Sequence, residues 1–355
     1  FYVWLPEEVR QYLLAEEYAA IAALYGLDGP ANFEDSHWHL RIVRSLADVA
    51  QQLGITQDSA QNLLASARQK LFVERQKRIH PGRDEKILVS WNGLMIKGMA
   101  RAAIVLDKRD WIACAQRAVD FIRATMWKNG RLLATYKDGR AHLNAYLDDY
   151  AFMLDGLIEL MQAEFRTEDL AFAQELANVL IEQFEDAANG GFFFTSHDHE
   201  KLIQRAKPMH DNATPCGNAV AALALQRLTY LTGEMRYAAA AERVLKLFYP
   251  QAAQRQGGFS SLMSVLAEHL EPPETIILRG ERSALSPCKQ ALARLYAPHR
   301  LVLAIPSGTQ KLTEILDKPV HDAVNAWVCR GVTCLAPIQD LQELLETCQS
   351  GQIDR

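Results

Sequence analysis

The sequence predicts a mainly α fold, with an inner ring of helices inside an outer ring and a small α/β region at the C-terminal end. Three observations indicate it. Apolar residues recur with helical spacing through most of residues 91–249. Turns at Gly130, Gly190 and Gly257 divide this region at intervals of 60 and 67 residues, which is typical of stacked helical hairpins. After residue 271 the pattern changes to short apolar runs typical of buried strands.

The composition excludes several classes of protein. The chain has 355 residues, of which 49% are hydrophobic and 23% charged, with a net charge of −5; this is ordinary for a globular protein with a sizeable core. The mild acidity argues against a nucleic-acid binder, and no apolar run approaches the roughly 20 residues that span a bilayer. The six cysteines are scattered, unlike a secreted disulfide framework, so we expect a reducing, cytoplasmic compartment.

Residues 1–54 have the least regular pattern, and a long helix follows them. We expect short helices at residues 6–9 and 17–25, a loop at residues 33–39 and the long helix at residues 56–79. The loop carries Phe33, Trp38 and His39. These side chains either line a pocket or anchor the loop by burial, and the second is the plainer interpretation.

Each of the three glycine-bounded units contains two helices. We expect the pairs at residues 91–108 and 110–126, 148–165 and 168–184, and 215–231 and 234–249. The first helix of each pair is richer in Ala, Gly and apolar residues, so we place it in the inner ring. The second carries more charge and belongs outside. Short strands at 131–136 and 192–195, and a hairpin turn at Asp138-Gly139, complete the first two units.

The C-terminal region reads as a small α/β fold. We expect strands at residues 275–278, 301–305 and 326–329, and helices at 287–296 and 341–347. The chain is therefore divided into a helical domain of residues 1–270 and an α/β domain of residues 271–355.

A polar stretch precedes the first helix of each unit, at residues 83–92, 144–150 and 209–218. Ser90 is a suitable N-cap for the first of these helices. The N-terminal end of a helix carries unpaired N–H groups and partial positive charge. It therefore favours carboxylates and anionic or hydroxyl-rich ligands.

Motifs within these stretches carry a family resemblance. They are Arg-Asp-Glu-Lys at 83–86, Ser-Trp-Asn-Gly-Leu-Met-Ile at 90–96, Tyr-Leu-Asp-Asp-Tyr-Ala-Phe at 146–152, Gly-Gly-Phe-Phe-Phe at 190–194, Asp-Asn-Ala-Thr-Pro at 211–215, Val-Cys-Arg at 328–330 and Thr-Cys at 333–334. In this order they resemble the YyaL family of spermatogenesis-associated, thioredoxin-domain-containing proteins. The resemblance extends over essentially the whole chain.

The resemblance implies a fold and a further domain. Full-length members begin with a thioredoxin-like domain that carries a redox cysteine motif, whereas this chain has no Cys-x-x-Cys and its residues 1–4 resemble the segment after that domain. The remainder is similar to the six-hairpin (α/α)6 toroids of N-acylglucosamine 2-epimerases and several glycosidases. We therefore expect such a toroid in residues 1–270, with the thioredoxin-like domain as a partner in full-length members and no nucleic-acid or membrane partner.

In such a toroid the loops before the inner helices converge on one funnel, which would bring the three polar stretches together. The candidate catalytic residues are Asp84, Asp149, His210 and Asp211. The candidate substrate-binding residues are Lys86, Trp91, Asn92, Tyr146, Asp148, Tyr150 and Asn212. Carboxylates beside aromatic side chains suit a sugar or sugar derivative, because carboxylates supply acid and base while aromatic faces pack against a pyranose ring.

Two reactions fit these residues. Epimerisation removes a proton beside a carbonyl and returns it on the other face, with His210 and either Asp149 or Asp211 as the acid and base. Hydrolysis needs two carboxylates across a glycosidic bond, such as Asp149 with Asp84 or Asp211. We expect no cofactor and no metal.

A hypothesis of another class is a toroid without catalysis, which binds a sugar or protein and serves the thioredoxin-like domain. The histidines bear on this choice. Sugar 2-epimerases of this fold rely on paired histidines, whereas here only His210 is well placed, with His80 and His142 less so.

Several candidates also have a purely structural interpretation. Ser90 and Asp148 can be helix caps, and Trp91 suits a core position. Asp84 and Lys86 can form surface ion pairs, which contribute little.

The cysteines and one histidine pair leave further alternatives. Cys216 is either a reactive thiol at a helix end or a small buried residue, and the sequence favours the second. Cys329 and Cys334 form either a regulatory disulfide or, as a reducing compartment favours, two buried thiols. Residues 197–199, His-Asp-His, have metal-ligand types but lie at an expected exposed hairpin tip.

Overall fold

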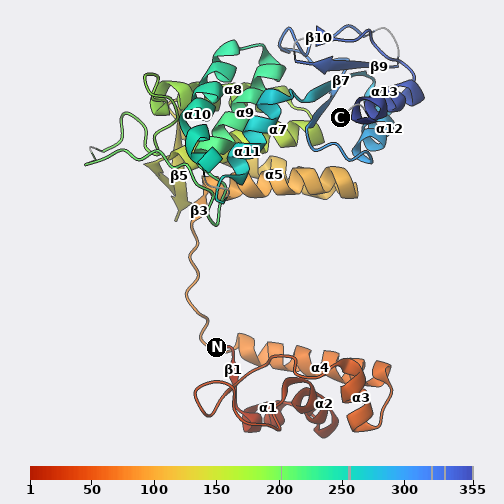
Figure 1. The fold of residues 1–355 in the computed structure, drawn as a ribbon. Helices are drawn as coiled ribbons and strands as arrows, with labels where there is room; N and C mark the ends of the chain where they lie inside the picture. Colours follow the sequence, from red (N-terminus) through yellow and green to blue (C-terminus); the bar gives the residue numbers. More distant parts are fainter. Residues whose placement is uncertain (201, 255–256, 321–322, 332, 354–355) are drawn as a thin grey trace. The chain divides into compact units, whose positions relative to one another are not determined.

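The computed structural model describes residues 1–200, 202–254, 257–320, 323–331 and 333–353, with side chains as far as Gln349. The chain forms two compact units, Phe1–Asp84 and Glu85–Arg355 (Figure 1). Within the described residues, no helix is long and apolar enough to cross a membrane.

The first unit is a small cluster of helices with a two-stranded ribbon. Its elements are β1 (Val3–Trp4), α1 (Pro6–Tyr12), α2 (Ala15–Tyr25), β2 (Trp38–His39), α3 (Leu46–Leu53) and α4 (Gln57–Gln76). Ile21 of α2, Val49 of α3 and Leu64 of α4 meet in its core. As predicted, Thr56 caps α4, because its side chain accepts a hydrogen bond from the Ser59 N–H.

Two predictions for this unit were wrong. Trp38 and His39 do not lie in a loop but pair with β1 as an antiparallel strand. Helix α3 was missed, although Ser45 marks its start: the Ser45 side chain accepts from the Asp48 N–H, and the Asp48 carboxylate accepts from the Ser45 N–H. This is a capping box with Asp in place of the usual Glu or Gln.

The second unit consists mainly of helical hairpins. Its helices up to residue 270 are α5 (Val89–Leu106), α6 (Arg109–Thr125), α7 (Leu147–Ala163), α8 (Thr167–Val179) with the π-turn η1 (Leu180–Phe184), α9 (Gly217–Thr232), α10 (Met235–Gln254) and α11 (Ser260–Leu270). Helices α5, α7, α9 and α11 pack in succession, and α6, α8 and α10 pack on their hairpin partners. This confirms the predicted class, mainly α with inner and outer helices of the (α/α)6 type. Closure of the ring to six hairpins stays a prediction.

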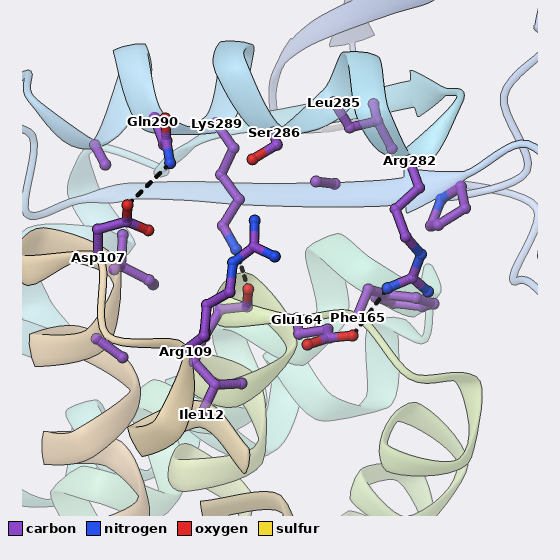
Figure 2. A pocket seen from close by; sticks show the side chains of 16 residues that line it. Asp107, Arg109, Ile112, Glu164, Phe165, Arg282, Leu285, Ser286, Lys289 and Gln290 are labelled. Carbon is purple, nitrogen blue, oxygen red and sulfur yellow. Dashed lines mark hydrogen bonds and ion pairs between the residues drawn. The ribbon is translucent and has the colours of Figure 1, made fainter.

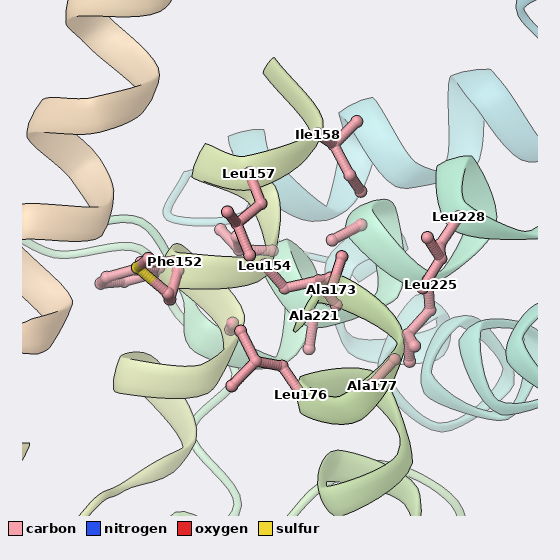
Figure 3. Packing of buried hydrophobic residues seen from close by; sticks show 14 of the residues in the cluster. Phe152, Leu154, Leu157, Ile158, Ala173, Leu176, Ala177, Ala221, Leu225 and Leu228 are labelled. Carbon is pink, nitrogen blue, oxygen red and sulfur yellow. The ribbon is translucent and has the colours of Figure 1, made fainter. Parts of the chain in front are cut away.

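The centre of this unit is α7. Every residue of α7 except Asp148 is buried. Figure 3 shows Leu154 and Leu157 of α7 packed among Leu176 of α8 and Leu225 of α9. A helix that is apolar on all sides needs neighbours on all sides, and α5, α8 and α9 supply them.

Two glycines let α5 and α7 approach closely. A Cβ at Gly93 would lie 2.6 Å from the backbone carbon of Phe152, and a Cβ at Gly156 would lie 2.8 Å from the backbone oxygen of Gly93. Real Cβ contacts are longer, so the two backbones touch at a point where only glycine fits.

Three corrections concern this unit. Helix α11 was missed, because Gly257 and Gly258 were taken as the end of the repeat. Helix α5 starts two residues earlier than predicted, at Val89 with Leu88 as its N-cap, so Ser90 is not the cap. The predicted strand 192–195 is only an isolated bridge of Phe192 to Glu185.

The Phe192 backbone has a side-chain partner instead of a strand. The buried Asn218 accepts from the Phe192 N–H at 2.7 Å and donates to the Phe192 carbonyl at 2.9 Å. One amide therefore satisfies both backbone groups that a neighbouring strand would have bonded.

A small antiparallel sheet lies beside the hairpins. It contains β3 (Ile87–Leu88), β4 (Trp127–Lys128), β5 (Arg131–Lys137) and β6 (Arg140–Asn144). The predicted turn joins β5 to β6, with φ of 50° at Asp138 and 78° at Gly139. Positive φ at both positions is typical of a two-residue hairpin turn.

The C-terminal region is α/β, as predicted. It contains β7 (Glu274–Gly280), α12 (Arg282–Ala293), β8 (Arg300–Pro306), β9 (Val324–Arg330), β10 (Thr333–Cys334) and α13 (Leu341–Ile353), with strand order β10-β9-β7-β8. Ile277 and Leu303 face the core of the hairpins, whereas Ile276 and Leu278 face α12 and α13. Side chains of the sheet thus belong to the same core as the hairpins. A separate domain that begins after residue 270 therefore stays a prediction.

Cys329 and Cys334 form a disulfide. They are directly opposite each other on the antiparallel strands β9 and β10. The interpretation as two free thiols was therefore wrong: a tight hairpin puts residues five apart in the sequence side by side. Cys216 is buried, as the sequence favoured.

The contact between α5 and α7 gives a stability prediction. Gly93→Ala should lower the free energy of unfolding by about 1–3 kcal/mol, because the new methyl group meets backbone that cannot move aside. Gly98→Ala is the control in the same helix, since nothing lies within 4 Å of its added Cβ; it should raise that free energy by about 0.5–1 kcal/mol. Urea denaturation measures both. Equal stability of the two variants would contradict the close helix contact.

Candidate functional site

The N-terminal ends of the four inner helices meet at one place. Asp149 hydrogen-bonds the starts of α5 and α7, and Asp211 does the same for α9 and α11. Gly217, the first residue of α9, lies against the Asp148 side chain of α7. The second and third polar stretches therefore meet the start of α5, where the first stretch ends.

Asp149 holds two helix ends. Its Oδ1 accepts from the Ser90 N–H at 2.8 Å and its Oδ2 from the Tyr146 N–H at 2.9 Å. The residue is buried, and burial raises the pKa of its carboxyl, while the hydrogen bonds from Tyr146 and Ser90 oppose that rise. Both oxygens thus satisfy N–H groups that a helix start leaves unpaired.

Asp211 has the equivalent position one hairpin further on. Its Oδ1 accepts from the Cys216 N–H and its Oδ2 from the Ser261 N–H, each at 2.8 Å. Burial raises the pKa of the Asp211 carboxyl, but the hydrogen bonds from Ser261 and Cys216 outweigh burial, so its pKa lies below the ordinary value. Asp211 therefore stays ionised at neutral pH.

Asp148 is the carboxyl group at this place that lacks such partners. Its Oδ1 is buried without a hydrogen-bond partner among the described residues. Burial, and next the charge of Asp149, raise the pKa of Asp148 to about 6. A Cβ at Gly217 would lie 2.0 Å from this Oδ1, so only glycine leaves room for the carboxyl. The sequence placed Asp148 among the binding residues, and that role stays a prediction.

The three aromatic residues predicted to bind a ligand differ in their exposure to solvent. Trp91 is 65% exposed, so the core position considered for it is wrong. Tyr146 is half-buried and stacks on Phe194, with ring centroids 5.0 Å apart and planes 15° apart. Tyr150 is fully buried, and its hydroxyl accepts from the Leu132 N–H at 2.8 Å. Tyr150 therefore cannot contact a ligand, which corrects its predicted role.

The remaining candidates are polar residues in the same stretches. His210 and Asn212 are exposed, and the His210 ring packs against Phe259 with centroids 4.6 Å apart. Asn92 is half-buried and donates to the Leu88 carbonyl at 2.8 Å. Lys86 is exposed just before β3.

Asp84 is the last residue of the first unit. Its predicted place beside the other candidates therefore stays a prediction, as does its catalytic role.

Residues 197–199 take no part in a metal cluster. Asp198 pairs with Arg131, and the described residues contain no group of three or more His, Cys, Asp or Glu side chains arranged to hold a metal. The sequence missed His199 as a neighbour of Tyr146, at 5.4 Å between ring centroids. It also gave no role to Phe194 or Gly217.

Buried ion pairs connect the inner helices behind this site. Arg227 of α9 pairs with Glu159 of α7 and with Glu268 of α11, and Arg101 of α5 also pairs with Glu159. Burial raises the pKa of the Glu159 carboxyl, but Arg227 and Arg101 outweigh burial and hold it below its ordinary value. Removing one member would leave an unpaired buried charge, which is strongly destabilising.

Comparison with known proteins agrees with the motifs. No family model matches the chain. The chain is similar to Spermatogenesis-associated protein 20. It is 28% identical to the human protein over 381 residues, which is 97% of this chain and 48% of that protein. It is 26% identical to the mouse protein, again over 97% of this chain and 48% of that protein. The resemblance read from the motifs is thus confirmed, and the chain spans about half the length of the curated relatives it matches.

Solved structures show a partial similarity. A D-mannose isomerase aligns with 60% of this chain and 58% of its own, at 16% identity and a TM-score of 0.41. Cellobiose 2-epimerase from Bacillus thermoamylovorans aligns with 48% of this chain and 46% of its own, at 14% identity and a TM-score of 0.40. An α-1,6-mannanase variant from Salegentibacter aligns with 57% of this chain and 56% of its own, at 14% identity and a TM-score of 0.38.

The two neighbouring aspartates should respond differently to substitution. Asp149→Asn replaces a charged acceptor of two backbone N–H groups by an amide that accepts only through oxygen. It should lower the free energy of unfolding by about 2–4 kcal/mol. Asp148→Asn should not lower that free energy, because one oxygen of the native carboxyl has no hydrogen-bond partner in the part of the chain that the structure describes. Denaturant titration at pH 7 measures both, and a larger loss for Asp148→Asn would contradict the assignment of Asp149 as the helix clamp.

The Asp148 carboxyl should also make stability depend on pH. Its pKa is about 6 in the folded chain, whereas the ordinary pKa of an aspartate, which we take for the unfolded chain, is 3.8. A pKa raised on folding gives stability that is present below the unfolded value and lost as pH rises through the folded value. Between pH 4 and pH 7 the native chain should lose about 2–3 kcal/mol relative to Asp148→Asn. Parallel stability–pH profiles of the two proteins would contradict the raised pKa.

Proposed function

We propose that the end of the inner helices where Asp148, Asp149 and Asp211 meet binds a carbohydrate, and that Asp148 acts on it as a general acid. The observation that supports this most is the Asp148 carboxyl, which has a pKa of about 6 and a buried oxygen without a hydrogen-bond partner among the described residues. A carboxyl with a pKa near the working pH holds a proton that it can also release.

Two carboxyl groups with opposite pKa shifts support acid–base work. Asp148 has a raised pKa and Asp211 a lowered one. Both act electrostatically on the Cys216 thiol, which they help to hold above its ordinary pKa after burial. One group is thus a proton donor and the other a permanent anion near it, the division of roles that glycoside hydrolysis uses.

Aromatic side chains support a sugar as the ligand. Trp91 is exposed at the start of α5, and Tyr146 stacks on Phe194 at the start of α7. Flat apolar faces beside carboxyl groups suit the apolar face and the hydroxyls of a pyranose ring.

In the proposed reaction Asp148 protonates the glycosidic oxygen as its bond to the anomeric carbon breaks, and the ionised Asp211 stabilises the positive charge that develops on the sugar. Water then adds to the anomeric carbon, and the proton that it releases restores Asp148. Epimerisation with His210 as the base is the second chemistry, since His210 is exposed beside Asp211. The first is better supported, because Asp148 has the environment of an acid.

A second candidate function is a sugar- or protein-binding module that serves a thioredoxin-like domain in a cytoplasmic protein. One observation favours it. Asp149 and Asp211, two of the four predicted catalytic groups, use both carboxylate oxygens to hold backbone N–H groups.

A sugar panel with matched variants tests the proposal. Mono-, di- and aryl glycosides are screened by thermal shift, because a ligand of the native state raises the melting temperature, and those that bind are assayed for turnover. Asp148→Asn should keep the thermal shift but lose turnover by about 10²–10⁴-fold. Turnover by the native chain should also fall as pH rises through 6.

Glu175→Gln is the control, since Glu175 is an exposed carboxylate on the outer helix α8. It should behave as the native chain does. Full turnover by Asp148→Asn would contradict the acid role. Binding without turnover by the native chain would favour the module, and a panel without any binding would contradict a carbohydrate site.

A further inference from the structure

A cavity lies at the ends of α5 and α7 opposite to Asp148. It has a volume of about 240 Å³. The ends of α5 and α7, the start of α6, one face of α12 and the end of β8 surround it (Figure 2). Because α7 has 17 residues, the cavity is roughly 25 Å from Asp148 along this helix. It is therefore separate from the proposed sugar site.

Most charged groups around this cavity have partners. Arg282 pairs with Glu164 at 3.0 Å, and Gln290 donates to the Asp107 carboxylate at 3.2 Å. Gln290 is neutral, so Asp107 keeps its charge, and the lining carries three cations, Arg109, Arg282 and Lys289, against two carboxylates. Of these cations only Arg282 forms an ion pair within the lining.

Arg109 and Lys289 are two neighbouring cations. Figure 2 shows both side chains reaching into the cavity, from α6 and α12. Lys289 donates to the Ala163 carbonyl at the end of α7, which uses one of its three N–H groups. Among the described residues, the Arg109 guanidinium has no hydrogen-bond or ion-pair partner.

The surroundings of Lys289 disfavour the positive charge of its amine. Burial, and among the neighbouring charges Arg109, lower the pKa of Lys289 to about 8, against the opposing effects of Glu164 and Asp107. An anion between the two cations would remove this repulsion and accept their remaining N–H groups.

The walls limit what such an anion can be. Ile104, Ile112, Phe165 and Leu285 are apolar, and Ser286 adds one hydroxyl. The volume is below the roughly 300 Å³ at which pockets for drug-sized ligands begin. We propose that Arg109 and Lys289 bind a small organic anion here, a carboxylate or a phosphate ester with a short apolar body.

Calorimetric titration of the full chain with three probes at pH 7 tests this: butyrate, glycerol phosphate and inorganic phosphate. Butyrate or glycerol phosphate should bind, and which of them binds more tightly identifies the acid group. Arg109→Gln and Lys289→Gln should each weaken binding by roughly tenfold or more. Arg109→Gln is the cleaner variant, since Lys289 also bonds the end of α7.

Arg117→Gln is the control, because Arg117 is an exposed cation two turns further along α6. It should leave the affinity unchanged. Affinity for the probe should fall as pH rises through 8 in the native chain but not in Lys289→Gln, because the protonated amine binds the anion.

Three results would overturn the proposal. The first is no binding of either organic probe at about 10 mM. The second is equal loss in Arg109→Gln and Arg117→Gln, which would indicate unspecific charge attraction. The third is inorganic phosphate binding as tightly as both organic probes, which would leave the apolar walls without a role.

Discussion

Buried carboxylates at the starts of the inner helices are the interaction on which this structure depends. The first N–H groups of a helix have no partner within it, and where four such ends meet, water cannot satisfy all of them. Asp149 and Asp211 solve this in the same way, each bridging the starts of two neighbouring helices. The partial positive charge of the helix ends also stabilises the two anions. These two carboxylates therefore fix the positions of the four helix starts.

The position of Asp148 follows from this arrangement. It is next to Asp149 in the sequence, but Asp149 already accepts from the N–H groups nearby. One buried oxygen of Asp148 therefore has no partner within the described ranges of the chain. The charge of Asp149 then adds to burial in raising its pKa. One pair of adjacent aspartates thus supplies a clamp of two helix starts and a carboxyl with a raised pKa. Gly217 completes the arrangement by leaving room for the Asp148 carboxyl.

Further along the inner helices, two other contacts set their register. Gly93 and Gly156 bring the backbones of α5 and α7 together, and Arg227 joins three helices through Glu159 and Glu268. At the far end, α12 and β8 cover the helix ends and enclose the cavity with Arg109 and Lys289. The two ends of one helix layer thus differ in charge. One end holds Asp148, Asp149 and Asp211, and the other holds three cations, Arg109, Arg282 and Lys289, beside two carboxylates.

The sequence by itself determined helices α5 to α10, their inner or outer position and the polar stretches before α5, α7 and α9, because apolar periodicity and glycine turns are local signals. It missed α3 and α11. The sequence also predicted that Asp148, Asp149, Asp211 and Tyr146 belong to one functional site, which stays a prediction. Only the tertiary structure decided what each does. Which aspartate finds a backbone N–H depends on a helix start distant in the sequence: 59 residues separate Ser90 from Asp149, and 50 separate Asp211 from Ser261. Tyr150 was misassigned for the same reason, since its partner Leu132 and its burial depend on β5 and not on neighbouring residues.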